Sequence, residues 1–307
     1  MKKWTKICLC IAGLTAMIAA DLLWEGIPEM TILKELRIPR IATAMLAGAA
    51  LALSGAQMQS IFRNPLADPH IMGVSSGAAL GAAIATMSGG QTEGITVVTA
   101  AFVGAAVASA VILAVSRKVR STATLLIFGV MLGFIVTAIV TILQFRSDAE
   151  SLKIFYSWSA GSFSNTTWKE VGIMFLTLAG GYIMAFRNRK GLDIILFGDE
   201  FAELSGAAPA RIRLTALLSC CLMTAAVTAF CGPLGFVGIV SPHIARAVLG
   251  TAAHKSILPV SILFGCSIGL LADFISYTAP APIPVASAMA LVGIPIILYI
   301  LVRRPSL

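Results

Sequence analysis

Few side chains of this sequence could carry out chemistry, and its three histidines come first among them. His70 and His243 each follow a proline, whereas His254 stands apart from both. Because imidazole is the commonest metal ligand in proteins, His70 and His243 could in principle coordinate one metal ion. Hydrogen bonding where a helix starts in a polar break is the simpler interpretation. We therefore predict no metal site in this chain.

A carboxylate inside an apolar stretch is the second candidate for chemistry. Asp273 follows Leu-Leu-Ala and precedes Phe-Ile-Ser. An ionisable group at that depth in a membrane is costly and marks a functional site by default. Proton-coupled transport would use such a group, but it usually needs ionisable partners at the same depth, and we expect none within a span here. The sequence favours a structural role for Asp273, near the outer end of its helix, over a proton relay.

The cysteines are predicted to act as small apolar side chains. They lie within or at the ends of apolar segments and lack CxxC spacing. The sequence also lacks the GxxxxGK(S/T) motif of nucleotide-binding loops and the HExxH motif of zinc proteases. We therefore predict that this chain is not an enzyme and binds no cofactor. The cysteines are Cys8, Cys10, Cys220, Cys221, Cys231 and Cys266.

Composition identifies the solvent in which these residues must be positioned. Of 307 residues, 58% are hydrophobic and 12% charged, with a mean hydropathy of +0.93. Soluble domains carry about a quarter charged residues, whereas apolar runs here are repeatedly long enough to cross about 30 Å of hydrocarbon. We predict an all-α polytopic membrane protein, one domain over residues 1–307. About ten helices are expected near 7–24, 41–61, 70–88, 95–115, 121–143, 170–186, 212–230, 234–249, 257–276 and 285–302.

The distribution of basic residues predicts the orientation. With the amino terminus in the cytoplasm, 16 of the 22 lysines and arginines fall inside, and six fall outside. This agrees with the positive-inside rule and places both termini in the cytoplasm of a bacterial plasma membrane. The net charge of +8 is then explained by topology, so no nucleic-acid partner is predicted. The outside residues are Lys34, Arg37, Arg40, Arg146, Lys153 and Lys169.

The first apolar run has an alternative interpretation. A basic start, the run ICLCIAGLTAMIAA and small residues near Ala20 are also typical of a cleaved signal peptide. Cleavage would leave nine spans without reversing any later one. We favour a retained first helix, because ten spans return both basic termini to the same side.

Two proline-centred segments resemble one another. NPLADPHIMG at 64–73 and GPLGFVGIVSPHIAR at 232–246 each contain Pro-Leu and then Pro-His-Ile. In the predicted topology they follow helices of opposite direction, so the second to fifth and the seventh to tenth helices would be inverted repeats, a common plan of transporters. Broken backbone in a membrane is tolerated only where it is buried in protein or lines a cavity.

Two polar segments lie between spans. Residues 187–213 form the most polar inside loop, where Asp199, Glu200 and Glu203 begin a short helix ended by Gly206 and Pro209. This helix is either a plain surface helix or a docking helix for a cytoplasmic partner. On the outside, a short re-entrant or interfacial helix is expected around residues 152–160.

Nearly the whole chain resembles one family. RIPR (37–40), AGAALALSGAQMQ (47–59), RNPLADPHIMGVSSGAALGAA (63–83), LLIFGVML (125–132), WSAGSF (158–163), GPLGFVGIVSPHIARAVLG (232–250), LPVS (258–261) and LLAD (270–273) follow its order and spacing. In these segments the chain is similar to the permease subunits of ABC importers for iron chelates, haem and cobalamin.

This resemblance implies a function and a set of partners. It implies a second permease subunit, two cytoplasmic ATPase subunits that hold ATP and magnesium, and an extracytoplasmic substrate-binding protein. The cargo would be a ferric chelate, an iron-siderophore or haem, with cobalamin a weaker expectation. In the family, the loop between the sixth and seventh helices contacts the ATPase, and the RxPR arginines meet acidic residues of the binding protein. Here these positions are Gly198, Asp199, Glu200, Ala202 and Gly206 for the ATPase, and Arg37 and Arg40 for the binding protein.

Two further expectations concern the path and the carboxyl-terminal edge. Gly129, Gly133, Thr137 and Thr141 recur every four residues on the fifth helix, as a pore-lining face or a small-residue packing stripe would. Near its end the chain departs from the family pattern. Tyr277 stands where the family usually has an arginine, and Pro282 where it has a glutamate, so one docking charge is absent there.

Overall fold

The computed structural model describes residues 3–23, 29–87, 94–119, 121–281 and 283–303. Within these ranges the chain is helical and contains no strand, which confirms the all-α prediction. The elements are α1 (Lys3–Leu23), α2 (Met30–Ile32), the π-helical turn η1 (Leu33–Arg37), α3 (Ile38–Ile61), the 3-10 turn η2 (Pro69–Met72), α4 (Val74–Met87), α5 (Gly94–Lys118), α6 (Thr122–Phe145), α7 (Ala149–Ser159), α8 (Trp168–Arg187), α9 (Arg189–Ile195), α10 (Asp199–Leu204), α11 (Pro209–Cys231), α12 (Val237–Leu249), α13 (His254–Thr278) and α14 (Val285–Arg303).

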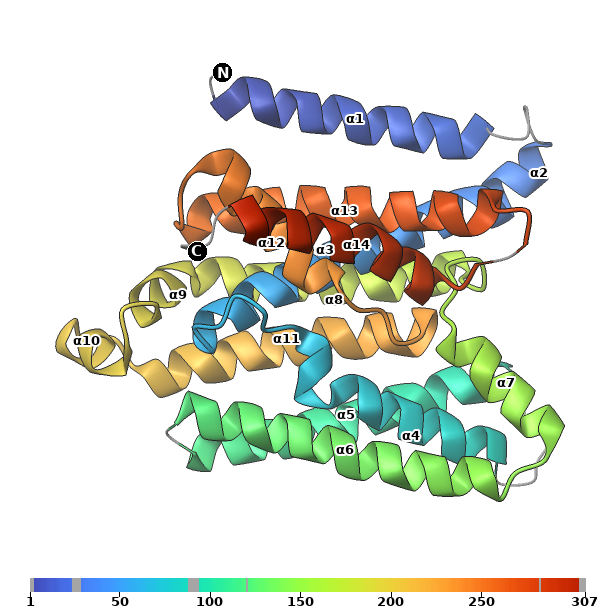
Figure 1. The fold of residues 1–307 in the computed structure, drawn as a ribbon, viewed down its shortest axis with the longest axis horizontal. Coiled ribbons are helices and arrows are strands. Elements are labelled where there is room, and N and C mark those ends of the chain that lie inside the picture. The colour runs from blue at the N-terminus through green and yellow to red at the C-terminus, as the bar shows by residue number, and fades with distance from the viewer. Residues whose placement is uncertain (1–2, 24–28, 88–93, 120, 282, 304–307) are drawn as a thin grey trace.

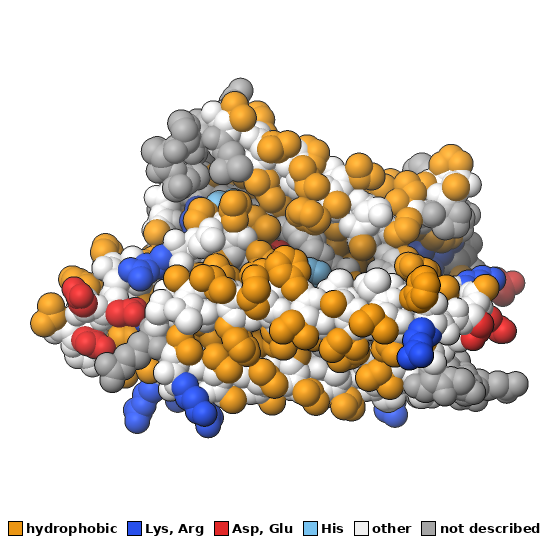
Figure 2. All heavy atoms as spheres, turned by 60° about the horizontal axis from the view of Figure 1, so that its bottom comes forward, with side chains coloured by type: hydrophobic (Ala, Val, Ile, Leu, Met, Phe, Trp, Pro, Cys, Tyr) orange, Lys and Arg blue, Asp and Glu red, His pale blue; other side chains and the backbone are white. Residues whose placement is uncertain are grey.

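The helices lie side by side along the long axis of the molecule (Figure 1), with α9 and α10 at one end and α7 at the other. We call these the α10 end and the α7 end. Six helices in the described ranges are long and apolar enough to cross a membrane, and four shorter apolar helices accompany them. Charged side chains gather at the two ends of the face shown in Figure 2, and apolar side chains cover the middle. This pattern is that of a bundle surrounded by lipid.

The helix that carries RIPR begins earlier than predicted. The expected span at 41–61 is one continuous helix from Met30 to Ile61, in which α2, η1 and α3 follow one another without a break. Arg37 and Arg40 therefore lie on successive turns of a helix. The helix expected around 152–160 is present as α7.

Helix α3 is the centre of the bundle, and its small residues allow neighbouring backbones to approach closely. A Cβ atom added at Gly48 would overlap the carbonyl of Gly265 on α13, and one added at Gly55 would overlap the carbonyl of Gly238 on α12. Gly269 stands in the same relation to Ala44. Helices in a membrane gain little from hydrophobic exclusion, so such close backbone contacts supply much of the packing energy.

The two halves of the bundle pack reciprocally. Helix α3 of the first half contacts α12 and α13 of the second, while α11 of the second half contacts α4 and α5 of the first. Within each half, the helix after the break packs against the next helix, as α4 does against α5 and α12 against α13. This exchange of partners is what inverted repeats produce, so it supports the predicted plan.

Replacing Gly265 by valine is expected to lower the stability of the bundle by about 3 kcal/mol, because added side-chain atoms would push α13 away from α3. Thermal unfolding of the purified protein in detergent would measure the loss. Gly172→Val on α8 is the matched control, since a Cβ there meets nothing within 4 Å. Equal stability of the two variants would contradict the packing argument.

Candidate functional site

The two proline-broken segments meet in the middle of the bundle. His243 Nε2 lies 2.9 Å from the carbonyl oxygen of Pro65, so the imidazole of one break contacts the backbone of the other. Gln59 Nε2 donates to the carbonyl oxygen of Gly238 at 3.2 Å, and Arg246 donates to Gln59 Oε1 at 2.7 Å. Side chains thus satisfy backbone groups that the broken helices leave free, as the absence of water in a bilayer requires.

The helices after the breaks both start at residues with left-handed backbone. Gly73 precedes α4 with φ of 81°, and Phe236 precedes α12 with φ of 70°. A bulky residue in this region of φ is a genuine outlier, and such strain is held by the surrounding structure. Asp68 stands beside the junction and accepts a hydrogen bond from the backbone N–H of His70 at 2.8 Å. Sequence reasoning identified both breaks but did not identify Phe236 as a strained residue.

The predicted face of α6 divides into two parts. Gly129 packs against Met72 and Gly133 lies close to Ser76, so the glycines fit the packing interpretation. Thr137 is exposed beside the break, and the hydroxyl of Thr141 donates to the carbonyl of Thr137 at 2.9 Å. Only the threonine half of the stripe can therefore face a path through the single chain.

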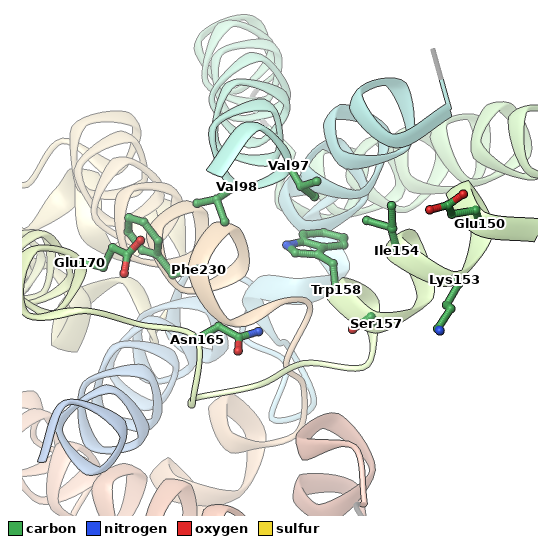
Figure 3. Close-up of a pocket in the computed structure, with 10 residues that line it drawn as sticks. All are labelled: Val97, Val98, Glu150, Lys153, Ile154, Ser157, Trp158, Asn165, Glu170 and Phe230. Atoms are coloured by element: carbon green, nitrogen blue, oxygen red, sulfur yellow. The ribbon is translucent and has the colours of Figure 1, made fainter. Parts of the chain in front are cut away.

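The α7 end holds two adjoining pockets. The first, of about 600 Å³, lies between α7 and the near ends of α5, α8 and α11 (Figure 3), with the side chains of Glu150, Lys153, Trp158 and Asn165 on its wall. The second, of about 640 Å³, lies beside Asp273 and Tyr277. Ser157 and Asn165 line both. Volumes of this size suit a small-molecule ligand.

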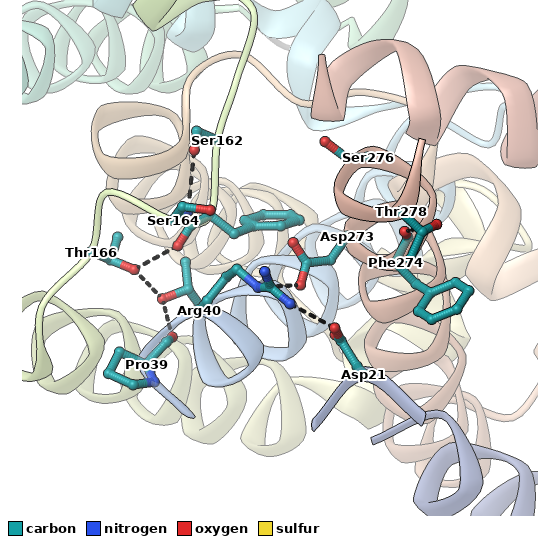
Figure 4. Close-up of polar contacts among 12 residues, drawn as sticks. Asp21, Pro39, Arg40, Ser162, Ser164, Thr166, Asp273, Phe274, Ser276 and Thr278 are labelled. Atoms are coloured by element: carbon teal, nitrogen blue, oxygen red, sulfur yellow. Dashed lines mark hydrogen bonds and ion pairs between the residues drawn. The ribbon is translucent and has the colours of Figure 1, made fainter. Parts of the chain in front are cut away.

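A buried ion cluster lies beside the second pocket (Figure 4). Arg40 donates to Asp21 Oδ1 at 2.6 Å, and its Nε lies 3.1 Å from Asp273 Oδ2. All three side chains are buried, and the guanidinium also stacks over the ring of Tyr277 at 4.0 Å. The prediction that Asp273 has no ionisable partner within a span is wrong, because helices from distant parts of the chain bring Arg40 and Asp21 to it. The structural role predicted for Asp273 is consistent with this pairing.

Arg37 and Arg40, which the resemblance assigned to contact with the binding protein, are both buried in the structure. Arg37 is 9% exposed and Arg40 6% exposed, and Arg37 donates to the carbonyl of Leu22 at 2.7 Å. Both arginines turn toward α1 because an unpaired cation on an apolar helix would be costly. The Asp21 contact also gives the first helix a place in the folded bundle. Tyr277 contacts Arg40, whereas Pro282 lies outside the described residues.

At the α10 end, the predicted contact loop forms a projecting helix. Gly198 and Gly206 flank α10 with φ of 109° and 76°, and Ala202 is buried beneath it. Asp199 forms an ion pair with Arg213 at the start of α11, whereas Glu200 is exposed. The exposed tip carries apolar side chains beside the acidic Glu200 and Glu203, with Phe197 at 74%, Phe201 at 49% and Leu204 at 89% exposure.

A hydrogen-bonded chain ties this end to the core. Asp193 of α9 accepts from the backbone N–H of His254 at 2.8 Å and lies 2.6 Å from its Nδ1, while Ser60 Oγ lies 2.6 Å from its Nε2. Partial burial raises the pKa of Asp193, but the hydrogen bonds from His254 and the charges of His254 and Arg189 outweigh it and hold that pKa below its usual value. Helices α9, α13 and α3 are therefore joined at one point. The sequence gave no signal for this contact, since its members are far apart along the chain.

Broken central helices, two pockets at one end and a projecting helix at the other are typical of a multi-span membrane permease. Residues 5–303 match the FecCD transport family, and the chain belongs to this family. ABC permeases of this kind form the membrane subunit, and ATP hydrolysis lies in a separate partner.

Individual relatives agree with this assignment. The chain is 36% identical to a cobalamin import system permease of Halobacterium salinarum, and the match covers 95% of this chain and 79% of the relative. It is 32% identical to an iron chelatin transport system permease of Helicobacter pylori, over 99% of this chain and 90% of the relative. It also superposes on a solved inward-facing metal-chelate type ABC transporter with a TM-score of 0.84 and 29% identity, covering 95% of this chain and 98% of the other.

Replacing Arg40 by methionine is expected to lower stability by about 3 to 5 kcal/mol, because Asp21 and Asp273 would then face each other buried and uncompensated. Thermal unfolding in detergent would measure it. The variant Asp21→Asn/Arg40→Met/Asp273→Asn should recover most of the loss, since no buried charge remains. If Arg40→Met alone unfolds at the wild-type temperature, the ion cluster is not what holds α1, α3 and α13 together.

Proposed function

We propose that this chain is the membrane subunit of an ATP-driven importer that passes a ferric chelate into the cytoplasm. The observation that carries the proposal is the meeting of two broken helices at the centre of a FecCD-family bundle, between the pockets of the α7 end and the projecting α10 helix. An iron-siderophore or haem is the cargo we favour, supported by similarity to an iron chelatin permease. Similarity to a cobalamin permease keeps cobalamin as the second candidate.

The orientation follows from charge and shape. We place the α10 end on the cytoplasmic side of a bacterial plasma membrane, where Phe197, Phe201 and Leu204 would insert into an apolar groove of one of the two ATPase subunits. Helix α1 begins and α14 ends at this same end (Figure 1), so both termini would be cytoplasmic. A second permease subunit would complete the path between two chains.

The α7 end would receive the binding protein. Because Arg37 and Arg40 are buried, the exposed cations available to acidic residues of that protein are other ones. Charges on such a rim mainly affect the rate of association and its salt dependence. The exposed cations at this end are Lys34, Arg146, Lys153 and Lys169.

No covalent step is required of this subunit. ATP binding on the partner chains would favour one of two arrangements of the broken helices, and a ligand shifts such an equilibrium only by its differential affinity for the two states. The alternative, a proton-coupled transporter working through Asp273, is disfavoured because that carboxylate is already paired with Arg40.

Uptake into proteoliposomes that contain the permease, its ATPase and the binding protein tests the proposal. We expect ATP-dependent uptake of a ferric siderophore or haem that survives a protonophore and persists in part in Asp273→Asn. Uptake of cyanocobalamin in the same assay, in place of the ferric chelates, would instead identify cobalamin as the cargo. Uptake without the ATPase, driven by a pH gradient and lost in Asp273→Asn, would instead establish the proton-coupled alternative.

The exposed tip of α10 should couple ATP hydrolysis by the ATPase to uptake through the permease. Leu204→Glu is expected to lower ATP-driven uptake at least about tenfold, because it places a charge in an apolar contact. Co-purification of the ATPase and its hydrolysis rate would be measured alongside. Leu204→Met, which keeps the apolar contact, is the matched control. Normal uptake by the glutamate variant would show that α10 does not contact the ATPase.

A further inference from the structure

A small cavity with a few polar side chains in its wall lies beside the first broken segment, apart from the pockets of the α7 end. Its volume is about 210 Å³, and its walls come from η2, the start of α4, the middle of α6 and the loop after α11. It is therefore bounded by both broken segments and by the helix that the sequence singled out. The lining residues are His70, Ser75, Ser76, Ala79, Thr137, Val140 and Pro233.

The imidazole of His70 has hydrogen-bonding capacity that the protein does not use. Its Nδ1 atom is buried and makes no hydrogen bond within the part of the chain that the structure describes. The backbone N–H of the same residue is already bonded to Asp68. Leaving a buried polar atom unpaired is energetically unfavourable. Other atoms of His70 line the cavity, and a rotation of the imidazole ring would turn this nitrogen toward it.

Three hydroxyl groups share the cavity with this histidine. Ser75 Oγ lies 3.3 Å from Thr228 Oγ1, which fixes its position, while Ser76 is half-buried and Thr137 is exposed. Polar groups at this depth of a membrane face the bundle interior or a water-filled cavity rather than lipid. In transporters, substrate sites lie where interrupted helices leave backbone open.

The lining selects the chemistry of what it can hold. Its wall contains no carboxylate, and the nearby Asp68 already accepts a hydrogen bond from the backbone N–H of His70. Imidazole and hydroxyl groups donate hydrogen bonds to oxygen atoms, and the amino end of α4 adds a partial positive charge. The volume corresponds to about seven water molecules at about 30 Å³ each. It would thus accept one oxygen-bearing anionic group rather than a whole chelate.

We propose that this cavity binds an oxygen-bearing anionic group of the cargo, such as a carboxylate, as it moves through the path. His70, Ser76 and Thr137 would be the residues that recognise it. The inference rests on the proposed function, since it assigns a contact site to that transport. The same chemistry could be presented by a chelate or by a free oxoanion.

Nuclear magnetic resonance of the histidine side chains tests the cavity without relying on transport. The permease, labelled with ¹⁵N-histidine and held in nanodiscs, has three imidazoles, of which His243 and His254 are buried and already bonded. Gallium citrate, a diamagnetic stand-in for ferric citrate, should shift the His70 signals and leave the other two unchanged. The variant His70→Gln assigns the signals. Molybdate, and citrate without metal, test binding of a free oxoanion. If only these two probes shift the His70 signals, the cavity binds a free anion and not a group of the chelate.

Uptake supplies the second readout. Thr137→Val should lower the uptake of ferric citrate about tenfold, whereas Thr177→Val, on α8 and outside the cavity, should not. Unchanged His70 signals with every probe would overturn the inference even if ATP-driven uptake is demonstrated. Conversely, a failure of uptake in the wild type with all chelates would contradict the proposed function, while the shift of the His70 signals would still decide the cavity.

Discussion

The close approach of α3 to α12 and α13 is the contact on which the rest of the structure depends. At Gly48 and Gly55 the facing carbonyl groups occupy the space that a side chain would need. Because lipid is as apolar as leucine, this approach, rather than exclusion from water, holds the two halves together. This contact also determines the positions of the two breaks and of the ion cluster. The breaks meet only because α3 runs directly along α12, and Arg40 reaches Asp273 only because α3 runs directly along α13.

Polar groups inside the bundle lie where a neighbouring helix supplies a hydrogen-bond or ion-pair partner. The breaks are satisfied by Gln59, His243 and Arg246, and the ion cluster encloses Arg40 between two carboxylates. Charges and free backbone groups are costly in hydrocarbon, so each of these contacts fixes a helix to its neighbour. The His70 cavity differs because its imidazole keeps an unused nitrogen. The hydrogen-bonded contacts thus surround the His70 cavity, where one polar atom keeps no partner among the described residues.

Much of the fold could be predicted from the sequence, because apolar length and the echo of two proline segments are local properties. The spans, α7 and the break positions follow from them. The ion cluster could not be predicted, because Asp21, Arg40 and Asp273 belong to helices that only tertiary packing brings together. Asp21 lies in a predicted span and was a signal that could have been used. The rotation of a helix is likewise invisible in one sequence, so the burial of Arg37 and Arg40 was not predicted, and the exposed apolar side chains of α10 were missed.

Helix α13 is fastened at both ends, through His254 to Asp193 at the α10 end and through Asp273 to Arg40 at the α7 end. A helix of 25 residues is about 37 Å long and stiff along its axis. A displacement of α13 at one end would therefore be transmitted to its other end along the helix itself, without involving the two broken segments. Thermodynamic linkage makes such a connection reciprocal. In an importer of the proposed kind, a binding protein that favours one position of α13 at the α7 end would therefore change the affinity of the α10 end for its own partner by the same factor.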